Sequence, residues 1–423
     1  MSFLTKTGQT TSGKGADPRM LRRRSKERVF CVGSSAALLL LFACGGLEDP
    51  GAESGEPQDR RGRLVIIGGG LQAENTPVYQ AILDGREGGG PVCVFPTASA
   101  EPQESMESAV GRIDAVGGPG SARGVFLTVD NPEDASSPAT VEAIESCSGF
   151  YFSGGQQRRI VSVFRPGEGD SPAYQALMQR FLAGAVVSGS SAGAAIMSDP
   201  MIGGGGSIDA LHSGIRWEDD AEGVFLREGM GFLETPLIDQ HSLARGRWAR
   251  LLTAVLGTEA YSFGTGIDEN TALVVEGDSA WVVGEAGVVF FDTRDALPAQ
   301  EGVGASGIIV SLLGPGDRLD LRTGRVTFDA EKPLVDLTEE MPGSLGDLSE
   351  MDLFGRWELL QFFTTTALLP DTVFTLSLEG FTFEFEKGPD FEARAGEGLG
   401  PGGTSRGLSA GPYLFSYSGG GSD

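Results

Sequence analysis

The segment Ala185-Val-Val-Ser-Gly-Ser-Ser-Ala-Gly-Ala-Ala195 decides the fold, because a short apolar run turns abruptly into an Ala-rich helix start. At the turn, Gly189-Ser-Ser-Ala-Gly193 fits the Gly-x-Ser-x-Gly pattern, in which a sharp strand-to-helix turn exposes the central hydroxyl. Glycines on both sides leave room for that turn, and the helix directs free N–H groups and its positive end to the same place. Ser191 is therefore a candidate nucleophile, with a simple Gly/Ser loop as the alternative.

Apolar runs before this segment come at the spacing of alternating strands and helices. Strands are expected at residues 64–67, 92–95, 124–129, 150–152 and 185–187. Continuous apolar strands that alternate with helices are typical of a parallel sheet covered on both faces. The predicted fold class is therefore α/β, with a three-layer αβα arrangement and a mostly parallel sheet. Its chemistry would lie at the carboxyl ends of the strands, where Gly68–Gly70, Gly154-Gly155 and Ser191 all fall.

Composition and motif spacing argue against several classes of function. The formal net charge of −26 disfavours nucleic acid and anionic membrane surfaces as partners. The run Gly68-Gly69-Gly70 lacks the full Gly-x-Gly-x-x-Gly pattern, so nucleotide binding is disfavoured. No Cys/His spacing suggests a metal site. Outside the N-terminal region only Cys93 and Cys147 remain; a disulfide between them is open, but two buried free thiols are favoured.

The chain contains two histidines, which makes the search for a general base short. An imidazole within reach of a serine supplies a base with a pKa near neutrality, and His241, at the end of Leu237-Ile-Asp-Gln-His241, is the better candidate. His212 lies in a glycine-rich stretch. The imidazole also needs an orienting carboxylate. Spacing leaves five candidates open: Asp209, Glu218, Asp219, Asp220 and Asp239.

Residues 1–43 have the pattern of a bacterial lipoprotein signal peptide. Basic residues between 19 and 28 precede an apolar run at 36–43 that is too short to span a bilayer. Leu41-Phe-Ala-Cys-Gly45 then resembles a lipobox with Cys44 as the lipidated residue; the alternative is an ordinary secretory signal cut near Ala43. We therefore expect an exported protein, anchored through Cys44 to the bacterial cell envelope or extracellular, with residues 44–62 as a flexible linker.

Between residues 63 and 292 a set of short motifs occurs in a definite order. They are Leu64-Val-Ile-Ile-Gly-Gly69, Phe95-Pro-Thr-Ala-Ser99, Phe152-Ser-Gly-Gly-Gln156, the turn at Ser191, Gly229-Met-Gly-Phe-Leu233, Ile238-Asp-Gln-His241, Arg245-Gly-Arg247 and Gly266-Ile-Asp-Glu-Asn-Thr-Ala-Leu273. Together they resemble the cyanophycinase and dipeptidase E family of serine peptidases. That resemblance implies a class I glutamine-amidotransferase-like (flavodoxin-like) fold.

The resemblance also implies roles for individual residues. Ser191 matches the nucleophile that forms the acyl-enzyme, His241 the base, and Asp209 best matches the acid. The remaining matches are Gly155 and Ala192 to the oxyanion-hole donors, and Gln156, Asp239, Arg247 and Arg250 to the substrate pocket. The implied reaction is hydrolysis of a β-aspartyl peptide bond such as β-Asp-Arg, without cofactor or metal.

The sequence departs from the family pattern beside the site. Gly70-Leu-Gln-Ala73 stands where an acidic pair is usual, and Ser242 stands where an aromatic residue is usual. An α-aspartyl dipeptidase, another small amidase on the same fold, or an inactive surface binding protein therefore stay open as alternatives. An α/β-hydrolase esterase fits less well, because its histidine normally lies near the chain end.

The resemblance places a catalytic domain at residues 63–335 and leaves 336–423 as a C-terminal extension of unknown role. Within the extension, residues 372–387 alternate apolar and polar side chains, which predicts a hairpin with Phe381, Phe383 and Phe385 on one face. From Phe391 onward the composition becomes Gly/Ser-rich and predicts a disordered tail. The sequence leaves a homodimer open.

Overall fold

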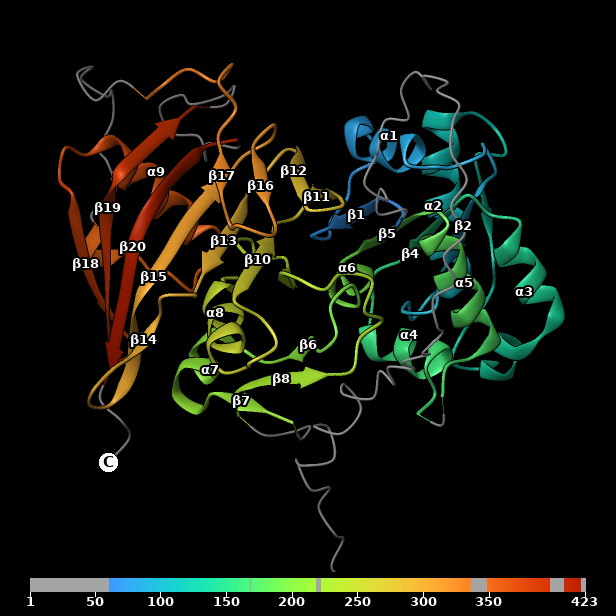
Figure 1. The fold of residues 1–423 in the computed structure, drawn as a ribbon, viewed down its shortest axis with the longest axis horizontal. Helices are drawn as coiled ribbons and strands as arrows, with labels where there is room; N and C mark the ends of the chain where they lie inside the picture. The colour runs from blue at the N-terminus through green and yellow to red at the C-terminus, as the bar shows by residue number, and fades with distance from the viewer. Residues whose placement is uncertain (1–60, 168, 218–221, 336–347, 396–406, 420–423) are drawn as a thin grey trace, which may run out of the picture. The chain divides into compact units, whose positions relative to one another are not determined.

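The computed structural model describes residues 61–167, 169–217, 222–335, 348–395 and 407–419 (Figure 1). The expected signal peptide 1–43, Cys44 and nearly all of the expected linker lie outside these residues. Within the described ranges, no helix is both long and apolar enough to cross a membrane.

A nine-stranded sheet forms the first part of the fold, with parallel strands at its centre and at one edge. Its order is β17-β16-β12-β11-β1-β5-β4-β2-β3. The parallel strands are β1 (Leu64–Ile67), β5 (Val186–Ser190), β4 (Gly149–Phe152), β2 (Val92–Phe95) and β3 (Ala122–Gly124). The antiparallel strands are β11 (Thr271–Glu276), β12 (Ser279–Gly284), β16 (Arg318–Asp320) and β17 (Val326–Thr327).

Helices cover both faces of the parallel strands, because successive side chains of a strand point to opposite faces and both sets are apolar (Figure 1). Leu64 and Ile66 of β1 pack in one cluster with α3 (Pro138–Glu145), α4 (Gln157–Phe164) and α5 (Pro172–Leu182). Val65 and Ile67 pack in another with α1 (Thr76–Asp84) and α2 (Pro102–Gly117). The predicted α/β class, with a largely parallel sheet between helices, is confirmed for this part of the chain.

Local signals fix the start of helix α5. Ser171 precedes Pro172 at the first helical position, and its side-chain oxygen accepts a hydrogen bond from the Tyr174 N–H (3.2 Å). A serine cap followed by proline suits a helix start, because the cap satisfies one free N–H and proline has none to lose. The same Ser-Pro arrangement begins α3 at Ser137.

A second sheet of eight strands joins the catalytic region to the C-terminal extension. Its order is β18-β19-β20-β15-β13-β10-β9, with β14 paired to β15. The strands are β9 (Leu237–Gln240), β10 (Phe263–Ile267), β13 (Val288–Asp292), β14 (Leu297–Pro298), β15 (Val303–Leu313), β18 (Val373–Leu378), β19 (Phe381–Arg394) and β20 (Ser409–Gly419). Helices α7 (Ser207–Ser213), α8 (Trp248–Leu256) and α9 (Glu358–Leu368) contribute to the core of this sheet.

Six short elements complete the described fold. Strands β6 (Met201–Gly204), β8 (Val224–Arg227) and β7 (Ile215–Arg216) form a three-stranded sheet. The 3-10 turns η2 (Pro132–Ser136) and η3 (Leu348–Glu350) and the one-turn helix α6 (Ala192–Ala195) are the others.

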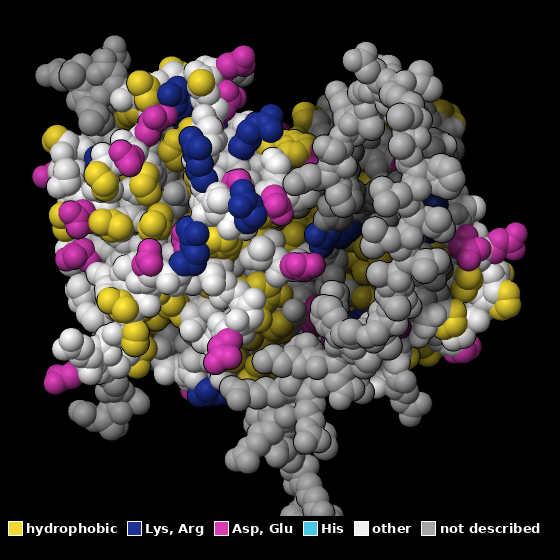
Figure 2. All heavy atoms as spheres, viewed as in Figure 1, with side chains coloured by type: hydrophobic (Ala, Val, Ile, Leu, Met, Phe, Trp, Pro, Cys, Tyr) yellow, Lys and Arg dark blue, Asp and Glu magenta, His cyan; other side chains and the backbone are white. Residues whose placement is uncertain are grey.

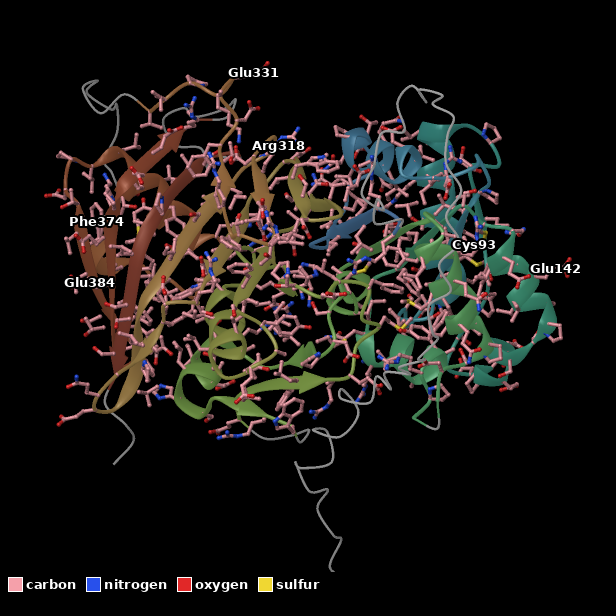
Figure 3. All side chains as sticks on the ribbon, viewed as in Figure 1. Cys93, Glu142, Arg318, Glu331, Phe374 and Glu384 are labelled. Carbon is pink, nitrogen blue, oxygen red and sulfur yellow. A yellow bond between two sulfur atoms is a disulfide. The ribbon has the colours of Figure 1, made fainter. Side chains whose placement is uncertain are left out.

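Two expectations about strands need correction. The strand expected at 124–129 is limited to β3 at 122–124. The tail expected to be disordered from Phe391 contains the end of β19 and all of β20, which pairs with β15 and β19. Residues 396–406 and 420–423 of that tail lie outside the described residues. The predicted hairpin at 372–387 is present as β18 and β19, with Phe374 and Glu384 labelled in Figure 3.

Strands of the C-terminal extension complete a sheet that begins in the catalytic region. The described residues, from 61 to 419 with the gaps given above, belong to one compact unit. Strand β20 lies between β15, before the expected boundary at 335/336, and β19, after it. The boundary therefore does not separate two independent packing units.

Cys93 and Cys147 form a disulfide, so the favoured expectation of two free thiols is wrong. Cys93 lies on β2, where Figure 3 labels it, and Cys147 lies just after α3. The pairing was open in sequence because a separation of 54 residues says nothing about proximity. The sheet brings the two Cα atoms to 5.9 Å, within the range that a disulfide requires.

Candidate active site

Ser191 occupies a strained turn between β5 and α6. Its backbone has φ 55° and ψ −104°, and its N–H donates to the Ile67 carbonyl (2.9 Å). The flanking glycines are required by close contact: a Cβ on Gly189 would lie 2.3 Å from the Gly193 carbonyl oxygen, and one on Gly193 would lie 2.4 Å from that of Phe152. The predicted strand-turn-helix geometry is therefore present, and it projects the serine side chain from the end of the strand.

His241 supplies the base that this hydroxyl needs. Its Nε2 lies 2.8 Å from Ser191 Oγ. The residue follows β9 with φ 53°, and its N–H donates to the Gly68 carbonyl (2.9 Å). A Cβ on Gly69 would lie 2.2 Å from His241 Cε1. The glycines after β1 thus leave space for the imidazole.

Glu269 is the carboxylate on the other side of the imidazole. Its Oε1 lies 2.6 Å from His241 Nδ1. Burial lowers the pKa of His241, and it outweighs the Glu269 hydrogen bond, which acts to raise it; the positive charges of Arg245 and Arg247 also lower it. Since the pKa lies below its usual value, the imidazole is neutral at neutral pH and can accept a proton.

Asp209, expected as the orienting acid, is not the carboxylate that contacts His241. It lies in the first turn of α7, whereas Glu269 follows β10. Strands β9 and β10 are parallel neighbours with Gln240 opposite Ile267, so the residues just after the two strands meet. The motif Gly266-Ile-Asp-Glu269 carried this signal, but sequence alone did not show that its strand lies beside the one that ends at His241. Of the other candidates, 218–220 lie outside the described residues.

Gly155 and Ala192, the predicted oxyanion-hole donors, lie in the segments next to Ser191, and this role stays a prediction. Ala192 directly follows Ser191, and a Cβ on the adjacent Gly154 would lie 3.4 Å from the Ser191 Cβ. In the described part of the chain, neither Gly155 N–H nor Ala192 N–H has an acceptor. Gly155 has φ 140°, and a Cβ there would lie 2.0 Å from the Ala98 carbonyl oxygen, so the loop requires glycine.

Asp239 and Arg250, both expected to bind substrate, form a hydrogen-bonded ion pair with each other instead. Arg250 donates to both carboxylate oxygens of Asp239 (2.7 Å each) and, through Nη1, to the Gly205 carbonyl (2.7 Å). Both side chains are buried, at 1% exposed for Asp239 and 4% for Arg250. The expectation that they bind substrate is therefore corrected, because this buried bidentate pair leaves neither side chain accessible.

Arg247 remains close to the nucleophile through Gln240. Its Nη1 donates to Gln240 Oε1 (2.9 Å), and the same oxygen lies 3.5 Å from Ser191 Oγ. Burial lowers the pKa of Arg247 to about 10, which leaves it positive at neutral pH. Sequence reasoning did not single out Gln240, although it lies within the Asp-Gln-His motif. Gln156 is exposed at the start of α4, where its side chain accepts from Arg158 (3.3 Å).

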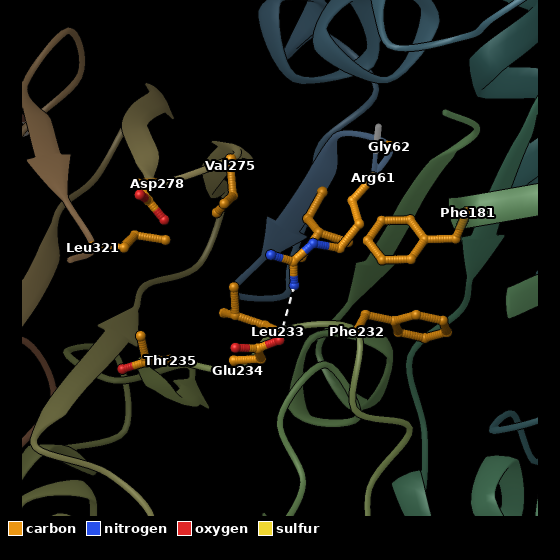
Figure 4. A pocket seen from close by; sticks show the side chains of 12 residues that line it. Arg61, Gly62, Phe181, Phe232, Leu233, Glu234, Thr235, Val275, Asp278 and Leu321 are labelled. Atoms are coloured by element: carbon orange, nitrogen blue, oxygen red, sulfur yellow. Dashed lines mark hydrogen bonds and ion pairs between the residues drawn. The ribbon is translucent and has the colours of Figure 1, made fainter. Parts of the chain in front are cut away.

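A groove begins beside Gln156. A separate pocket lies at the other end of the parallel strands, away from Ser191. The groove is lined by α4, β6 and β8, with Arg158, Met201 and Phe225 among its residues. The other pocket, shown in Figure 4, includes Gly62, before β1, and an Arg61–Glu234 ion pair (3.1 Å). Because it lies at the amino ends of the parallel strands, that pocket is not part of the site around Ser191.

The described residues contain no group of three or more His, Cys, Asp or Glu side chains that could hold a metal ion. They do contain a serine, an imidazole and a carboxylate in hydrogen-bond contact. On an α/β fold with the serine at a strand-to-helix turn, this arrangement defines a serine hydrolase.

The chain belongs to peptidase family S51, whose family model matches residues 64–283, and it is a serine-type peptidase. The cyanophycinase of Nostoc sp. is 28% identical over 287 residues, which cover 65% of this chain and 91% of the relative. The cyanophycinase of Synechococcus elongatus is 29% identical over 279 residues, which cover 63% and 81%. The proposed resemblance to the cyanophycinase and dipeptidase E family is confirmed.

Two solved structures are also similar. A peptidase from an acI-B1 Actinobacterium has a TM-score of 0.44 and 23% identity, and covers 62% of this chain and 98% of its own. A putative peptidase E protein from Listeria monocytogenes has a TM-score of 0.36 and 13% identity, and covers 53% and 98%.

Proposed function

We propose that the protein is a cyanophycinase-like exopeptidase that hydrolyses β-aspartyl peptide bonds of the β-Asp-Arg type, on a glutamine-amidotransferase-like scaffold. The observation that carries this proposal is the series from Ser191 through His241 to Glu269, with contacts of 2.8 and 2.6 Å. The similarity to cyanophycinases supports the choice of substrate.

In the proposed reaction, His241 Nε2 takes the proton of Ser191 Oγ as that oxygen attacks the carbonyl carbon of the β-linked bond. The N–H groups of Gly155 and Ala192 bind the negative oxygen that forms. The imidazolium then gives its proton to the leaving amine, which departs as arginine and leaves an acyl-enzyme. A water molecule, deprotonated by His241, attacks the ester, and Ser191 regains its proton as aspartate leaves. Glu269 orients the imidazole and stabilises its positive form.

Arg247 is the proposed contact for the free carboxylate of the aspartyl residue. A guanidinium group matches a carboxylate in shape and charge. Arg250 cannot take this role without breaking its pair with Asp239, whereas Arg247 is bound to the neutral amide oxygen of Gln240. A substrate carboxylate could replace that neutral acceptor at lower cost.

Hydrolysis of β-Asp-Arg, α-Asp-Arg and a simple ester by the purified protein tests the proposal, with Ser191→Ala as the control. Release of arginine from the β-linked dipeptide alone, lost in the variant, is the expected result. Preference for the α-linked dipeptide would make the protein an α-aspartyl dipeptidase, and turnover of the ester alone would exclude both peptidase assignments.

We also propose that the protein is exported and anchored by lipid at Cys44. The pattern of residues 1–45 and the Cys93–Cys147 disulfide support export, because disulfides persist mainly in oxidising compartments. Basic and acidic side chains are interspersed on the part of the face that Figure 2 colours. Cys44→Ala should release the protein from the membrane fraction; unchanged membrane association would exclude the anchor.

A further inference from the structure

We propose that Trp357, in the C-terminal extension, is a positioning residue for catalysis: it holds the segment that carries Glu269 and the loop that follows His241 in register with each other. This inference rests on the proposed roles of Glu269 and His241. Trp357 lies outside residues 64–283, the part of the chain that the family model matches.

The first observation is the way Trp357 is bound between the two segments. Its indole Nε1–H donates to Asp268 Oδ2 (3.1 Å), and its backbone N–H donates to the Leu243 carbonyl (2.8 Å). Asp268 Oδ1 accepts from the Ala244 N–H (2.8 Å). Asp268 directly precedes Glu269, and Leu243 and Ala244 follow His241 by two and three residues. One tryptophan thus connects the segments that carry the proposed acid and base.

The second observation is that the residues just before Trp357 are held against the loop that follows His241. The Trp248 indole N–H donates to the Leu353 carbonyl (2.7 Å), and the ring of Trp248 stacks on Phe354 with centroids 5.6 Å apart. A Cβ on Gly246 would lie 1.9 Å from the Phe354 carbonyl oxygen, so glycine is required where the extension crosses the loop. The segment before Trp357 is therefore seated on residues 246–248.

The third observation concerns the conformation and surroundings of Trp357 itself. Its φ of 60° is unfavourable for a bulky residue and persists only where surrounding contacts enforce it. The indole also lines a cavity of about 240 Å³ together with Asp268, Glu269 and Arg356. Behind the proposed acid there is thus open space bounded by the extension, and direct packing does not fill it. The hydrogen bond from the Trp357 indole to Asp268 links the extension directly to the residue before Glu269.

Asp268 needs that donor because its side chain is 1% exposed. A buried carboxylate is costly unless its oxygens are hydrogen-bonded; Asp268 Oδ1 accepts from the Ala244 N–H, Oδ2 accepts from the Trp357 indole, and the backbone of Glu269 also donates to the carboxylate. Without the indole, Oδ2 lacks this partner, and we expect the Asp268–Glu269 segment to shift. A small shift of Glu269 would misalign the imidazole, and misplacement of a reacting group can lower a rate by up to about 10²-fold.

The test is Trp357→Phe, which keeps an aromatic ring and removes the indole N–H, with Trp217→Phe, at an exposed tryptophan, as the matched control. Saturation kinetics with a fluorophosphonate that acylates Ser191 give a maximal inactivation rate and an apparent KI. We expect Trp357→Phe to lower the maximal rate about tenfold with KI unchanged, and the control to change neither. If the protein folds poorly, Asp268→Asn should give the same split, because its amide offers one acceptor in place of two.

Proton NMR gives a second readout, because the chain has two histidines and the Nδ1 proton shared by His241 and Glu269 should resonate far downfield. We expect this signal to move or broaden in Trp357→Phe. An unchanged maximal rate and an unchanged signal in a folded variant would overturn the inference. Failure of β-Asp-Arg hydrolysis alone, with labelling still affected, would overturn the proposed substrate and leave Trp357 as a positioning residue. Absence of labelling in the wild type would overturn both.

Discussion

At the scale of single residues, the burial of His241 and the charges around it set how the site responds to pH. Burial lowers the pKa of the imidazole, the hydrogen bond that His241 donates to Glu269 raises it, and the charges of Arg245 and Arg247 lower it. Because the folded-state pKa lies below the usual value of about 6.5, the base is already neutral in slightly acidic solution. Activity should therefore reach its plateau by neutral pH and fall only below the usual histidine range.

Glu269→Gln should lower turnover about 10³-fold while the protein stays folded, because an amide cannot stabilise the imidazolium and can favour the wrong tautomer. Asp209→Asn is the matched control, since its side chain does not contact His241. Steady-state kinetics of both variants and of the wild type show whether Glu269 or Asp209 is the orienting acid. A larger loss in Asp209→Asn would contradict the geometry of the site.

Arg245→Ala should move the acidic limb of the pH–rate profile to higher pH. The positive charge of Arg245 disfavours the imidazolium, so its removal raises the pKa of His241 toward its usual value. Arg245 is half-exposed and its charge is screened, so the shift should be on the order of a few tenths of a pH unit. Arg318→Ala, on β16, is the control and should leave the acidic limb unchanged. A shift of the limb to lower pH in Arg245→Ala would show that Arg245 does not lower the pKa of His241.

At this scale, the sequence predicts features that depend on neighbouring residues and misses contacts between residues far apart in the chain. The local pattern around Ser191 predicts its turn, and the presence of two histidines nearly selects His241. Glu269 could not be selected, because its contact with His241 depends on β9 and β10 being neighbours. The pairing of Arg250 with Asp239 was missed for a similar reason: a helix must fold back on a strand to bury both.

At the scale of elements, the glycines at the carboxyl ends of the strands make room for catalytic side chains. Gly69→Ala should lower activity at least about 10²-fold, because its Cβ would lie 2.2 Å from His241 Cε1 and its φ of 112° disfavours any side chain. The matched control is Gly111→Ala in α2, where a Cβ meets nothing within 4 Å. We expect that variant to keep full activity and gain about 0.5–1 kcal/mol of stability.

Turnover and thermal unfolding of the two alanine variants check this prediction. A Gly69→Ala enzyme of normal activity would show that the imidazole can move without loss. Because both variants add the same methyl group, the comparison distinguishes the general effect of a glycine-to-alanine change from its effect at the active site.

Elements with a strong local pattern could be predicted, and those that depend on remote partners could not. Apolar runs predict β1, β2, β4 and β5, and alternation predicts the hairpin of β18 and β19. Strand β20 was not predicted, because its Gly- and Ser-rich sequence has weak strand preference. Pairing with β15 on one side and β19 on the other holds it in the sheet.

At the scale of the whole molecule, the C-terminal extension belongs to the catalytic fold. A chain that stops after residue 395 should fail to give a soluble, active enzyme, because loss of β20 exposes two strand edges and removes the buried side chains of Tyr413 and Phe415. A chain that stops after residue 419 is the control and should behave as the full protein does. Soluble yield and fluorophosphonate labelling measure both, and an active 395-residue chain would show that β20 is dispensable.

The account depends most directly on Ser191 as the nucleophile activated by His241 and Glu269. The measurement that tests it is fluorophosphonate labelling followed by peptide mass mapping, on the wild type and on Ser191→Ala, Glu269→Gln and Asp209→Asn. We expect one probe on the peptide that contains Ser191, none in Ser191→Ala, slow labelling in Glu269→Gln and normal labelling in Asp209→Asn. A probe on another residue, or equal labelling of Glu269→Gln and the wild type, would contradict the proposed triad.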